Sequence, residues 1–295
     1  MKSGYVAVVG RANAGKSTLV NVLVGEKVAI VSPKPQTTRD RIMGVLTTDD
    51  YQIAFIDTPG IYKADNLLSS VMQKTATDTV GDVDLVLFVL DAHDGVSEKD
   101  RTLIKSIKEK GAPTIIALTK TDIMPESLLI SEIKELAEEN LEIVPVSARR
   151  GRNIKELIKV ILQFLPEGDK LFEEDIISDR SEKFMIAEIM REKILLKFQK
   201  EIPHGVAIIV NEFKLREDGR VYDINLDIVC EKPNHKAILV GKGGKAIKEV
   251  SSFARADMEK FLGRKVFLTT YVKVEEDWRN SAYLLKEHGY GKGNV

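Results

Sequence analysis

The stretch Gly10-Arg11-Ala12-Asn13-Ala14-Gly15-Lys16-Ser17 decides the fold of this chain. It fits the pattern of a phosphate-binding P-loop, in which two glycines enclose four residues and a lysine and a serine follow. An apolar run, Tyr5 to Val9, precedes the motif, and a helical pattern from Lys16 to about Val24 follows it. The motif requires this context of strand, glycine-rich turn and helix. We therefore expect a P-loop at the start of an α/β domain.

A P-loop binds polyphosphates because its backbone N–H groups and the N-terminus of the following helix face the anion. We expect Lys16 to neutralise the outer phosphates and the Ser17 hydroxyl to bind Mg²⁺. Further nucleotide contacts are expected from Asn13, Ala14, Gly15 and Thr18. The alternative is a glycine-rich turn that binds nothing, and the complete motif in its proper context disfavours it.

A second polar motif, Asp57-Thr58-Pro59-Gly60, ends another apolar run. We expect Asp57 to hold the Mg²⁺ through a water molecule and the Gly60 N–H to sense a γ-phosphate, with Thr58 and Pro59 between them. By itself this sequence is an ordinary turn. Its position after a P-loop favours the nucleotide site.

A third motif, Thr119-Lys120-Thr121-Asp122, follows a further apolar strand. The Asp122 carboxylate can accept two hydrogen bonds from guanine, while the Lys120 stem covers the base ring. Adenine offers no such pair of donors, so Asp122 predicts selection of GTP over ATP. Ser147-Ala148-Arg149 ends the last strand of this half, where backbone N–H groups can meet the guanine oxygen.

The first half of the chain alternates short apolar runs with amphipathic stretches, which is typical of an α/β sheet. Two strand-like runs, Ile42 to Thr48 and Tyr51 to Ile56, are separated only by Asp49 and Asp50. So short a link cannot hold a crossover helix, and we expect an antiparallel hairpin on an otherwise parallel sheet. The other predicted strands are Tyr5 to Val9, Leu85 to Leu90, Thr114 to Leu118 and Ile143 to Val146. Further helices are expected near 97–109, 127–138 and 153–164, the last capped by Asn153.

The second half begins after a break in periodicity. We expect a GTPase-type domain over residues 1–168, a linker over 169–180 that is rich in acidic residues, and a second domain over 181–295. The second domain reads as helix, strand, strand, helix, helix, strand, followed by a packed C-terminal helix. Apolar and polar residues alternate from Tyr222 to Glu231, which predicts a sheet with one wet face. The pattern indicates a small α+β domain.

The composition fits two soluble globular domains. The chain has 295 residues, of which 43% are hydrophobic and 30% charged, and a formal net charge of −1. These values exclude a disordered or collagenous chain. The single Cys230 excludes a disulfide framework and a cysteine-rich zinc site. No signal peptide and no apolar run of membrane-spanning length are present. We expect a soluble protein of the cytoplasm.

Positive charge is concentrated in the second domain. Residues 232–265 carry nine Lys or Arg and three acidic residues. In their midst lies Gly241-Lys242-Gly243-Gly244, which fits the GXXG loop of a KH domain between two helices. Such a loop lets the backbone of a single RNA strand approach closely, with Lys242, Lys245 and Lys248 beside it. Alone, the motif is more often a helix-capping turn, but the element order and the local charge favour the KH interpretation.

The four motifs of the first half occur in the order of the translation-factor-related GTPases, which the chain resembles. That resemblance identifies Gln36-Thr37-Thr38-Arg39 with switch I and favours Thr38 over Thr37 as the residue that closes on Mg²⁺ and the γ-phosphate. With Lys16 and Gly60, Thr38 is thus a candidate catalytic residue. Asn13 resembles a residue with which some relatives bind K⁺, so potassium is a candidate cofactor beside GTP, GDP and Mg²⁺.

Two positions depart from the pattern of these GTPases. Thr119 replaces the usual Asn, and we expect it to lack the donor that reaches the base and braces the P-loop. Ile61 stands where related enzymes have the Gln that orients the attacking water, so we expect slow hydrolysis.

A P-loop GTPase domain followed by a type II KH domain, with Pro35 to Arg39 in switch I, resembles the Era family of ribosome-assembly GTPases. The resemblance implies binding to single-stranded ribosomal RNA near the 3′ end of the small subunit during its assembly. It also implies peripheral association with the inner face of the cell membrane. We expect a monomer. The alternatives are an RNA-binding module with an inactive P-loop fold, and a GTPase that acts on protein or membrane with a vestigial second domain.

Overall fold

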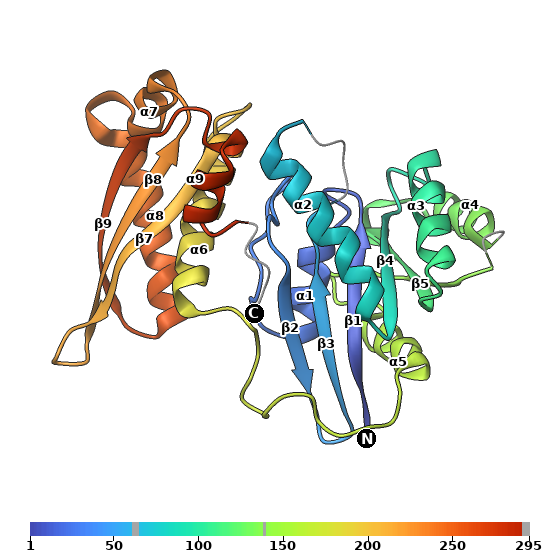
Figure 1. The fold of residues 1–295 in the computed structure, drawn as a ribbon. Coiled ribbons are helices and arrows are strands. Elements are labelled where there is room, and N and C mark those ends of the chain that lie inside the picture. Colours follow the sequence, from blue (N-terminus) through green and yellow to red (C-terminus); the bar gives the residue numbers. More distant parts are fainter. Residues whose placement is uncertain (61–64, 138–139, 291–295) are drawn as a thin grey trace. The chain divides into compact units, whose positions relative to one another are not determined.

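The computed structural model describes residues 1–60, 65–137 and 140–290 (Figure 1). The chain forms two compact units. Among the described residues, the first comprises 1–31, 38–60, 72–137 and 140–179, and the second comprises 32–37, 65–71 and 180–290.

The first unit is built on a six-stranded sheet in the order β2-β3-β1-β4-β5-β6. Strand β2 pairs antiparallel with β3, and the other neighbours are parallel. This arrangement confirms the hairpin that the two-residue link predicts. The strands are β1 (Lys2–Gly10), β2 (Ile42–Thr47), β3 (Tyr51–Asp57), β4 (Leu85–Asp91), β5 (Thr114–Thr119) and β6 (Glu142–Pro145).

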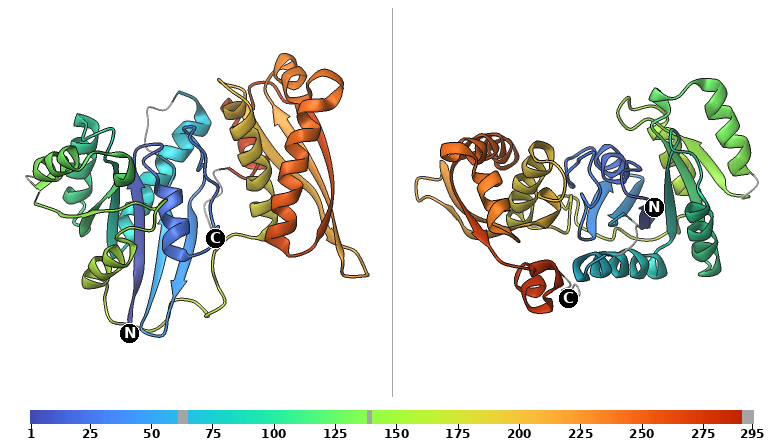
Figure 2. Two further views of the ribbon diagram at one scale, coloured as in Figure 1. Left: turned by 180° about the vertical axis from the view of Figure 1, so that it is seen from behind. Right: turned by 90° about the horizontal axis from the view of Figure 1, so that it is seen from above.

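Helices cover both faces of this sheet (Figure 2). On one face, α1 and α5 contribute Leu19, Leu23 and Leu157 to a core with Val8 and Phe55. On the other, α3 and α4 contribute Ile104, Ile107 and Leu136. The helices are α1 (Lys16–Val24), α3 (Glu98–Glu109), α4 (Glu126–Ala137) and α5 (Ile154–Phe164), together with the part of α2 (Leu67–Asp78) from Met72 onward.

Three details of the first unit differ from the sequence-based expectations. Helix α2 was not predicted. Asn153 precedes α5 but does not cap it, because its side chain donates to Pro145 O (2.8 Å) and it adopts a left-handed conformation. Residues 169–179, which were expected to form a linker, belong to the first unit and are hydrogen-bonded to its sheet. Val45 N of β2 donates to Ile177 O (2.8 Å), and the Gln52 side chain of β3 donates to Phe172 O.

The second unit has the α+β order that the sequence predicts. A three-stranded sheet, β7-β8-β9, has β7 antiparallel and β9 parallel to β8. Helices α6 and α8 lie side by side on one face (Figure 2). The elements are α6 (Glu182–Lys197), β7 (Val206–Leu215), β8 (Val221–Cys230), α7 (Pro233–Val240), α8 (Lys245–Leu262), β9 (Lys265–Val274) and α9 (Ala282–Glu287).

The expected wet face of β8 is only partly wet. Asp227, Val229 and Glu231 are buried, although they alternate with the core residues of the strand. Lys273 pairs with Asp227, and Arg279 pairs with Glu231 at 2.6 Å. The prediction is therefore wrong for the C-terminal half of β8, because charges from the last part of the chain compensate its buried carboxylates.

Candidate nucleotide and RNA sites

The P-loop connects β1 to α1 and closes around the Lys16 side chain. Lys16 is the first residue of α1 and is 5% exposed. Its ammonium donates to the carbonyl oxygens of Gly10 (3.1 Å) and Arg11 (2.8 Å). Burial lowers the pKa of Lys16 to about 8, and the nearby Asp57 carboxylate opposes this shift. The loop thus holds a positive charge at the helix N-terminus, where anions bind.

Three oxygen-bearing side chains meet at the start of α1. The Ser17 hydroxyl donates to Asp57 Oδ2 (2.6 Å) and lies 2.8 Å from Thr38 Oγ1. The Thr38 hydroxyl lies 3.2 Å from the same carboxylate oxygen. The structure therefore brings together the three residues predicted as Mg²⁺ ligands, from α1, from the segment before β2 and from the end of β3.

This cluster fits a magnesium ion. Hydroxyl and carboxylate oxygens are the ligands that Mg²⁺ prefers, and adjacent ligands in its octahedral shell lie about 3 Å apart, close to the separation of the two hydroxyls. Asp57 is fully buried, and its Oδ1 has no hydrogen-bond partner among the described residues. Burial raises the pKa of Asp57, and Lys16 and the two hydroxyls lower it only in part. A cation or its water would satisfy this oxygen.

Gly60 lies against the P-loop backbone. A Cβ atom on Gly60 would come within 2.7 Å of Ala12 Cα and 2.8 Å of Ala12 N. Any larger residue would push the two loops apart, so the close approach requires glycine. The Thr58 hydroxyl donates to Val8 O (2.8 Å), which fixes the start of this loop to β1. The prediction made for Ile61 falls outside the described residues.

The base motif follows β5. Lys120 adopts a left-handed backbone conformation, and its ammonium pairs with Asp91 at the end of β4 (2.5 Å). The Ser147 hydroxyl donates to Asp122 Oδ1 (2.6 Å), and this hydrogen bond lowers the pKa of Asp122. Asp122 is therefore held ionised with its carboxylate oriented, as an acceptor for guanine donors must be.

Thr119 braces the P-loop, contrary to the expectation for its short side chain. Its Oγ1 lies 2.6 Å from Ala14 O and 2.9 Å from Leu90 O, in a buried position. The hydroxyl can thus join β5 to the P-loop, and that part of the expectation is wrong. The missing amide donor toward the base remains a prediction.

Sequence reasoning missed two supporting carboxylates. Asp91, which orients Lys120, stands at the end of β4 and belongs to no motif. Asp100 is buried in the first turn of α3 and pairs with Arg11 of the P-loop at 3.0 Å. Its capping box with Ser97 is readable in the sequence as a helix start. Nothing in the sequence pattern connects Asp91 to Lys120 or Asp100 to the P-loop.

The remaining predicted nucleotide-site residues lie in switch I, on the P-loop and α1, and after β3 and β6. Within switch I, the Thr37 hydroxyl donates to Lys34 O (2.6 Å) and is thereby engaged locally, whereas Thr38 joins the Mg²⁺ cluster. Asn13 is an exposed P-loop residue with a left-handed backbone. Ala14, Gly15 and Thr18 lie on the loop and the first turn of α1, Pro59 lies between Thr58 and Gly60, and Ala148 and Arg149 follow β6.

The GXXG sequence forms the turn between α7 and α8. Gly241 ends α7 at φ 72°, and a Cβ there would lie 2.6 Å from the Ala246 Cβ. Around Gly243 a Cβ would meet no atom within 4 Å. Lys242, Lys245 and Lys248 are exposed, and Gly244 lies between them at the N-terminus of α8. The predicted RNA-binding residues therefore share one bare, positively charged turn.

Two protein-family models match this chain, one in each half of the sequence. Residues 5–120 match the family model of the 50S ribosome-binding GTPases, and residues 201–279 match the KH domain model. Among the described residues, no helix is long and apolar enough to cross a membrane.

Curated relatives match over nearly the whole length. The chain is 44% identical to GTPase Era of Clostridium kluyveri over 292 residues, which covers 98% of this chain and 99% of the relative. It is 46% identical to GTPase Era of Alkaliphilus metalliredigens over 292 residues, with the same coverage.

Two solved structures are similar to the whole chain, each with a TM-score of 0.95, 40% identity and coverage of 98% of this chain and 99% of the other. One is Era in complex with MgGDPNP and nucleotides 1506–1542 of 16S ribosomal RNA. The other is a variant of Aquifex aeolicus Era bound to GDP.AlF4-. The P-loop site, the KH turn and these full-length relatives lead to one assignment: the chain belongs to the Era family of GTPases.

Proposed function

We propose that the protein is a GTP-hydrolysing switch that binds single-stranded ribosomal RNA near the 3′ end of the small subunit and assists assembly of that subunit. The observation that carries the GTPase assignment is the cluster of Ser17, Thr38 and Asp57 oxygens beside the buried Lys16 ammonium. It joins a cation site to a phosphate site. Asp122, oriented by Ser147, supplies selectivity for guanine.

Each residue has a defined part in this function. Lys16 neutralises the outer phosphates, and the P-loop N–H groups bind their oxygens. Ser17 and Thr38 would hold the Mg²⁺ directly and Asp57 through water, and the ion, when bound, offsets charge that develops on the phosphates. The Gly60 N–H lies on the loop packed against Ala12 and can donate to a γ-phosphate. Thr38 lies against Ser17 and Asp57, and a bound γ-phosphate and Mg²⁺ would hold its segment in this position.

Turnover of GTP by the purified protein in the presence of Mg²⁺ tests this proposal. We expect slow release of phosphate from GTP and none from ATP. Lys16→Ala should lose nucleotide binding, while Lys183→Ala removes an exposed lysine far along the sequence and should change nothing. A protein that binds RNA but does not hydrolyse GTP would support the rival interpretation of an RNA-binding module with an inactive P-loop.

The RNA partner is proposed from the KH turn and from a relative. The Era structure named above holds nucleotides 1506–1542 of 16S ribosomal RNA. We expect this chain to retain RNA of the same 3′ terminal sequence on a filter. GTP hydrolysis without any RNA binding would favour the other rival, a GTPase that acts on protein or membrane with a vestigial KH domain.

We further propose a monomer, a cytoplasmic location and peripheral association with the inner face of the cell membrane, the last of which the family resemblance implies. Light scattering coupled to size-exclusion chromatography measures the first. Fractionation of cells, followed by a high-salt wash of the membranes, measures the other two, because a peripheral protein is released by salt.

A further inference from the structure

Two turns meet at the end of the second unit that lies farthest along α8 from the GXXG loop (Figure 1). They are the β7–β8 turn, residues 216–220, and the turn from α8 to β9, residues 263–264. The Arg264 guanidinium donates to Gly219 O and ties them together. Since α8 has 18 residues, these turns lie about 27 Å along the helix axis from the GXXG loop.

An open hollow of about 680 Å³ lies between the two turns. Three basic side chains, Arg220, Arg264 and Lys265, and a single acidic one, Glu259, line it. Glu259 already accepts hydrogen bonds from Lys265 (3.3 Å), from Arg255 (3.1 Å) and from the Val266 N–H (3.2 Å). The lining of the hollow therefore carries a net positive charge, which is complementary to a phosphate backbone. The exposed acidic residues Glu217 and Asp218 of the β7–β8 turn are not part of this lining.

An exposed aromatic ring stands beside the hollow. Phe267 on β9 is 59% exposed, because Val266 and Leu268, its neighbours in the strand, point to the core. The Arg216 guanidinium lies 5.6 Å from the centre of its ring. Asp223 holds that guanidinium through two hydrogen bonds, from Nε (2.8 Å) and from Nη2 (2.7 Å). Tyr271, which is 55% exposed, follows at the alternating position on the same face.

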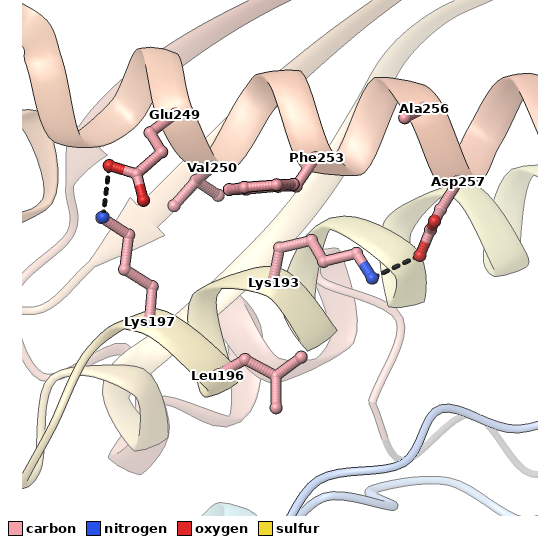
Figure 3. A pocket seen from close by; sticks show the side chains of 8 residues that line it. All are labelled: Lys193, Leu196, Lys197, Glu249, Val250, Phe253, Ala256 and Asp257. Atoms are coloured by element: carbon pink, nitrogen blue, oxygen red, sulfur yellow. Dashed lines mark ion pairs between the residues drawn. The ribbon is translucent and has the colours of Figure 1, made fainter.

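A second hollow shows what distinguishes this one. It lies between α6 and α8, measures about 370 Å³ and exposes Leu196 and Phe253 (Figure 3). Its lysines are paired across the two helices, Lys197 with Glu249 (2.7 Å) and Lys193 with Asp257. Positive and negative charges balance there, so of these two hollows only the one at the far end of α8 is complementary in charge to RNA.

We propose that Arg220, Arg264, Lys265 and Phe267 form a second contact for single-stranded RNA, in which the basic residues bind phosphates and the phenyl ring stacks on a base. This inference rests on the proposed RNA binding and extends it. Stacking on aromatic rings beside cationic grooves is a common mode of binding single strands. A GXXG loop clamps four nucleotides, and a stacked strand advances about 3.4 Å per nucleotide. A strand held by both sites must thus continue about eight nucleotides beyond the loop.

The test uses the full-length protein and two RNAs of the 3′ terminal sequence, one of about five nucleotides, which the GXXG loop alone can hold, and one of about 20 nucleotides. The Arg220→Ser/Lys265→Ser variant should bind the long RNA at least fivefold more weakly. Its log-log salt slope should fall by about 1.4, which is 0.7 for each of the two phosphates released. Binding of the short RNA should not change. Lys183→Ser/Lys286→Ser removes two exposed charges elsewhere in the unit and is the matched control.

Phe267 separates stacking from charge. Phe267→Leu keeps an apolar side chain and should weaken binding of the long RNA about fivefold or more, whereas Phe267→Tyr should retain it. If all these variants bind RNA with wild-type affinity and salt slope, the inference is overturned. The same variants are also tested for binding to phosphatidylserine vesicles, and weaker vesicle binding with unchanged RNA binding would show that the surface contacts a membrane instead. In both cases the Lys242 and Gly243 variants described below still test the GXXG loop. If the wild-type protein binds neither RNA, the proposed function fails as well.

Discussion

The Thr119 hydroxyl lies 2.6 Å from the carbonyl oxygen of Ala14, so the strand that carries the base motif is joined directly to the P-loop. Both residues are buried, with Ala14 at 3% exposure and Thr119 at 2%. A phosphate loop and a base site that share a hydrogen bond are positioned together. Thr119 therefore supplies the bracing hydrogen bond that the sequence pattern assigns to a longer amide side chain.

Replacing Thr119 by Val, which has the same shape without the hydroxyl, should weaken GTP binding. The Ala14 carbonyl would lose its partner, at a cost of about 1 to 2 kcal/mol, or about 5- to 30-fold in affinity if the loop must shift to find another. Thr119→Ser keeps the hydroxyl and is the control. Titration calorimetry measures both variants, and equal affinities for the two would contradict the bracing role.

The base contact makes a second prediction. Asp122→Asn should shift preference from GTP to xanthosine triphosphate, because an amide can donate to the second base oxygen where the carboxylate only accepts. The loss for GTP should be about 1 to 3 kcal/mol. Competition between the two nucleotides for the variant measures the shift. Unchanged GTP affinity would remove Asp122 from the site.

The motifs and the hairpin could be predicted because each depends on local sequence. A two-residue link between Ile42 to Thr48 and Tyr51 to Ile56 permits only an antiparallel pair, and the structure contains it. Helix α2 was not predicted, although Leu68, Met72 and Ala76 recur every four residues, as on one face of a helix. Only the tertiary structure shows that these three are buried.

The supporting contacts of the site could not be predicted, even where they join predicted residues, because they connect segments that are distant in the sequence. Asp91 and Lys120 are 29 positions apart, and Ser147 and Asp122 are 25 apart. The same limit explains the error at β8, where Lys273 and Arg279 compensate Asp227 and Glu231. Alternation indicates which side a residue faces, but not what later covers that side.

The lowered pKa of Lys16 predicts that nucleotide affinity depends on pH. In the free protein Lys16 loses its proton as the pH rises through about 8, whereas bound phosphates require it protonated. Binding above that pH must take up a proton. The affinity for nucleotide should therefore decrease between about pH 8 and about pH 9, with a slope that approaches a tenfold decrease per pH unit. In Lys16→Arg the charge does not titrate, and this additional slope should vanish.

The lowered pKa of Lys16 should affect folding stability in the opposite direction, so that stability rises with pH where nucleotide affinity falls. The folded-state pKa of about 8 lies below the value of 10.5 expected for Lys16 in an unfolded chain. The buried charge therefore destabilises the nucleotide-free protein at pH values below 8, and this penalty is relieved as the pH rises from 8 toward 10.5. A pH-independent affinity together with a flat stability contribution from Lys16, measured against Lys16→Arg, would contradict the burial of its charge.

Potassium should accelerate hydrolysis if Asn13 helps to hold it. Phosphate release should then be faster in KCl than in NaCl at equal ionic strength. Asn13 has a φ of 64°, so Asn13→Gly removes the side chain without backbone strain and should abolish the difference. Equal rates of the wild-type protein in the two salts would reject a potassium site.

RNA binding should depend on the GXXG loop. Lys242→Asp/Gly243→Asp in the full-length protein should abolish RNA binding and leave the GTP hydrolysis measured without RNA unchanged. A carboxylate at position 243 repels phosphate and fills the space through which a backbone would approach. The fold should survive, because a Cβ at Gly243 meets no atom within 4 Å and its φ of 60° is one that Asp tolerates.

A matched control exists in the same unit. Lys286→Asp/Gly289→Asp makes the same two changes at an exposed lysine and at a glycine with φ of 86° and no atom within 4 Å. It alters the net charge equally, so any general electrostatic effect on RNA binding will appear in both variants. Neutralising Lys245 or Lys248 adds an independent measure, because each phosphate that the variant no longer binds should lower the salt slope by about 0.7. Equal RNA affinity of the two double variants, with circular dichroism showing both folded, would reduce the glycine loop to a turn between helices and place the RNA elsewhere.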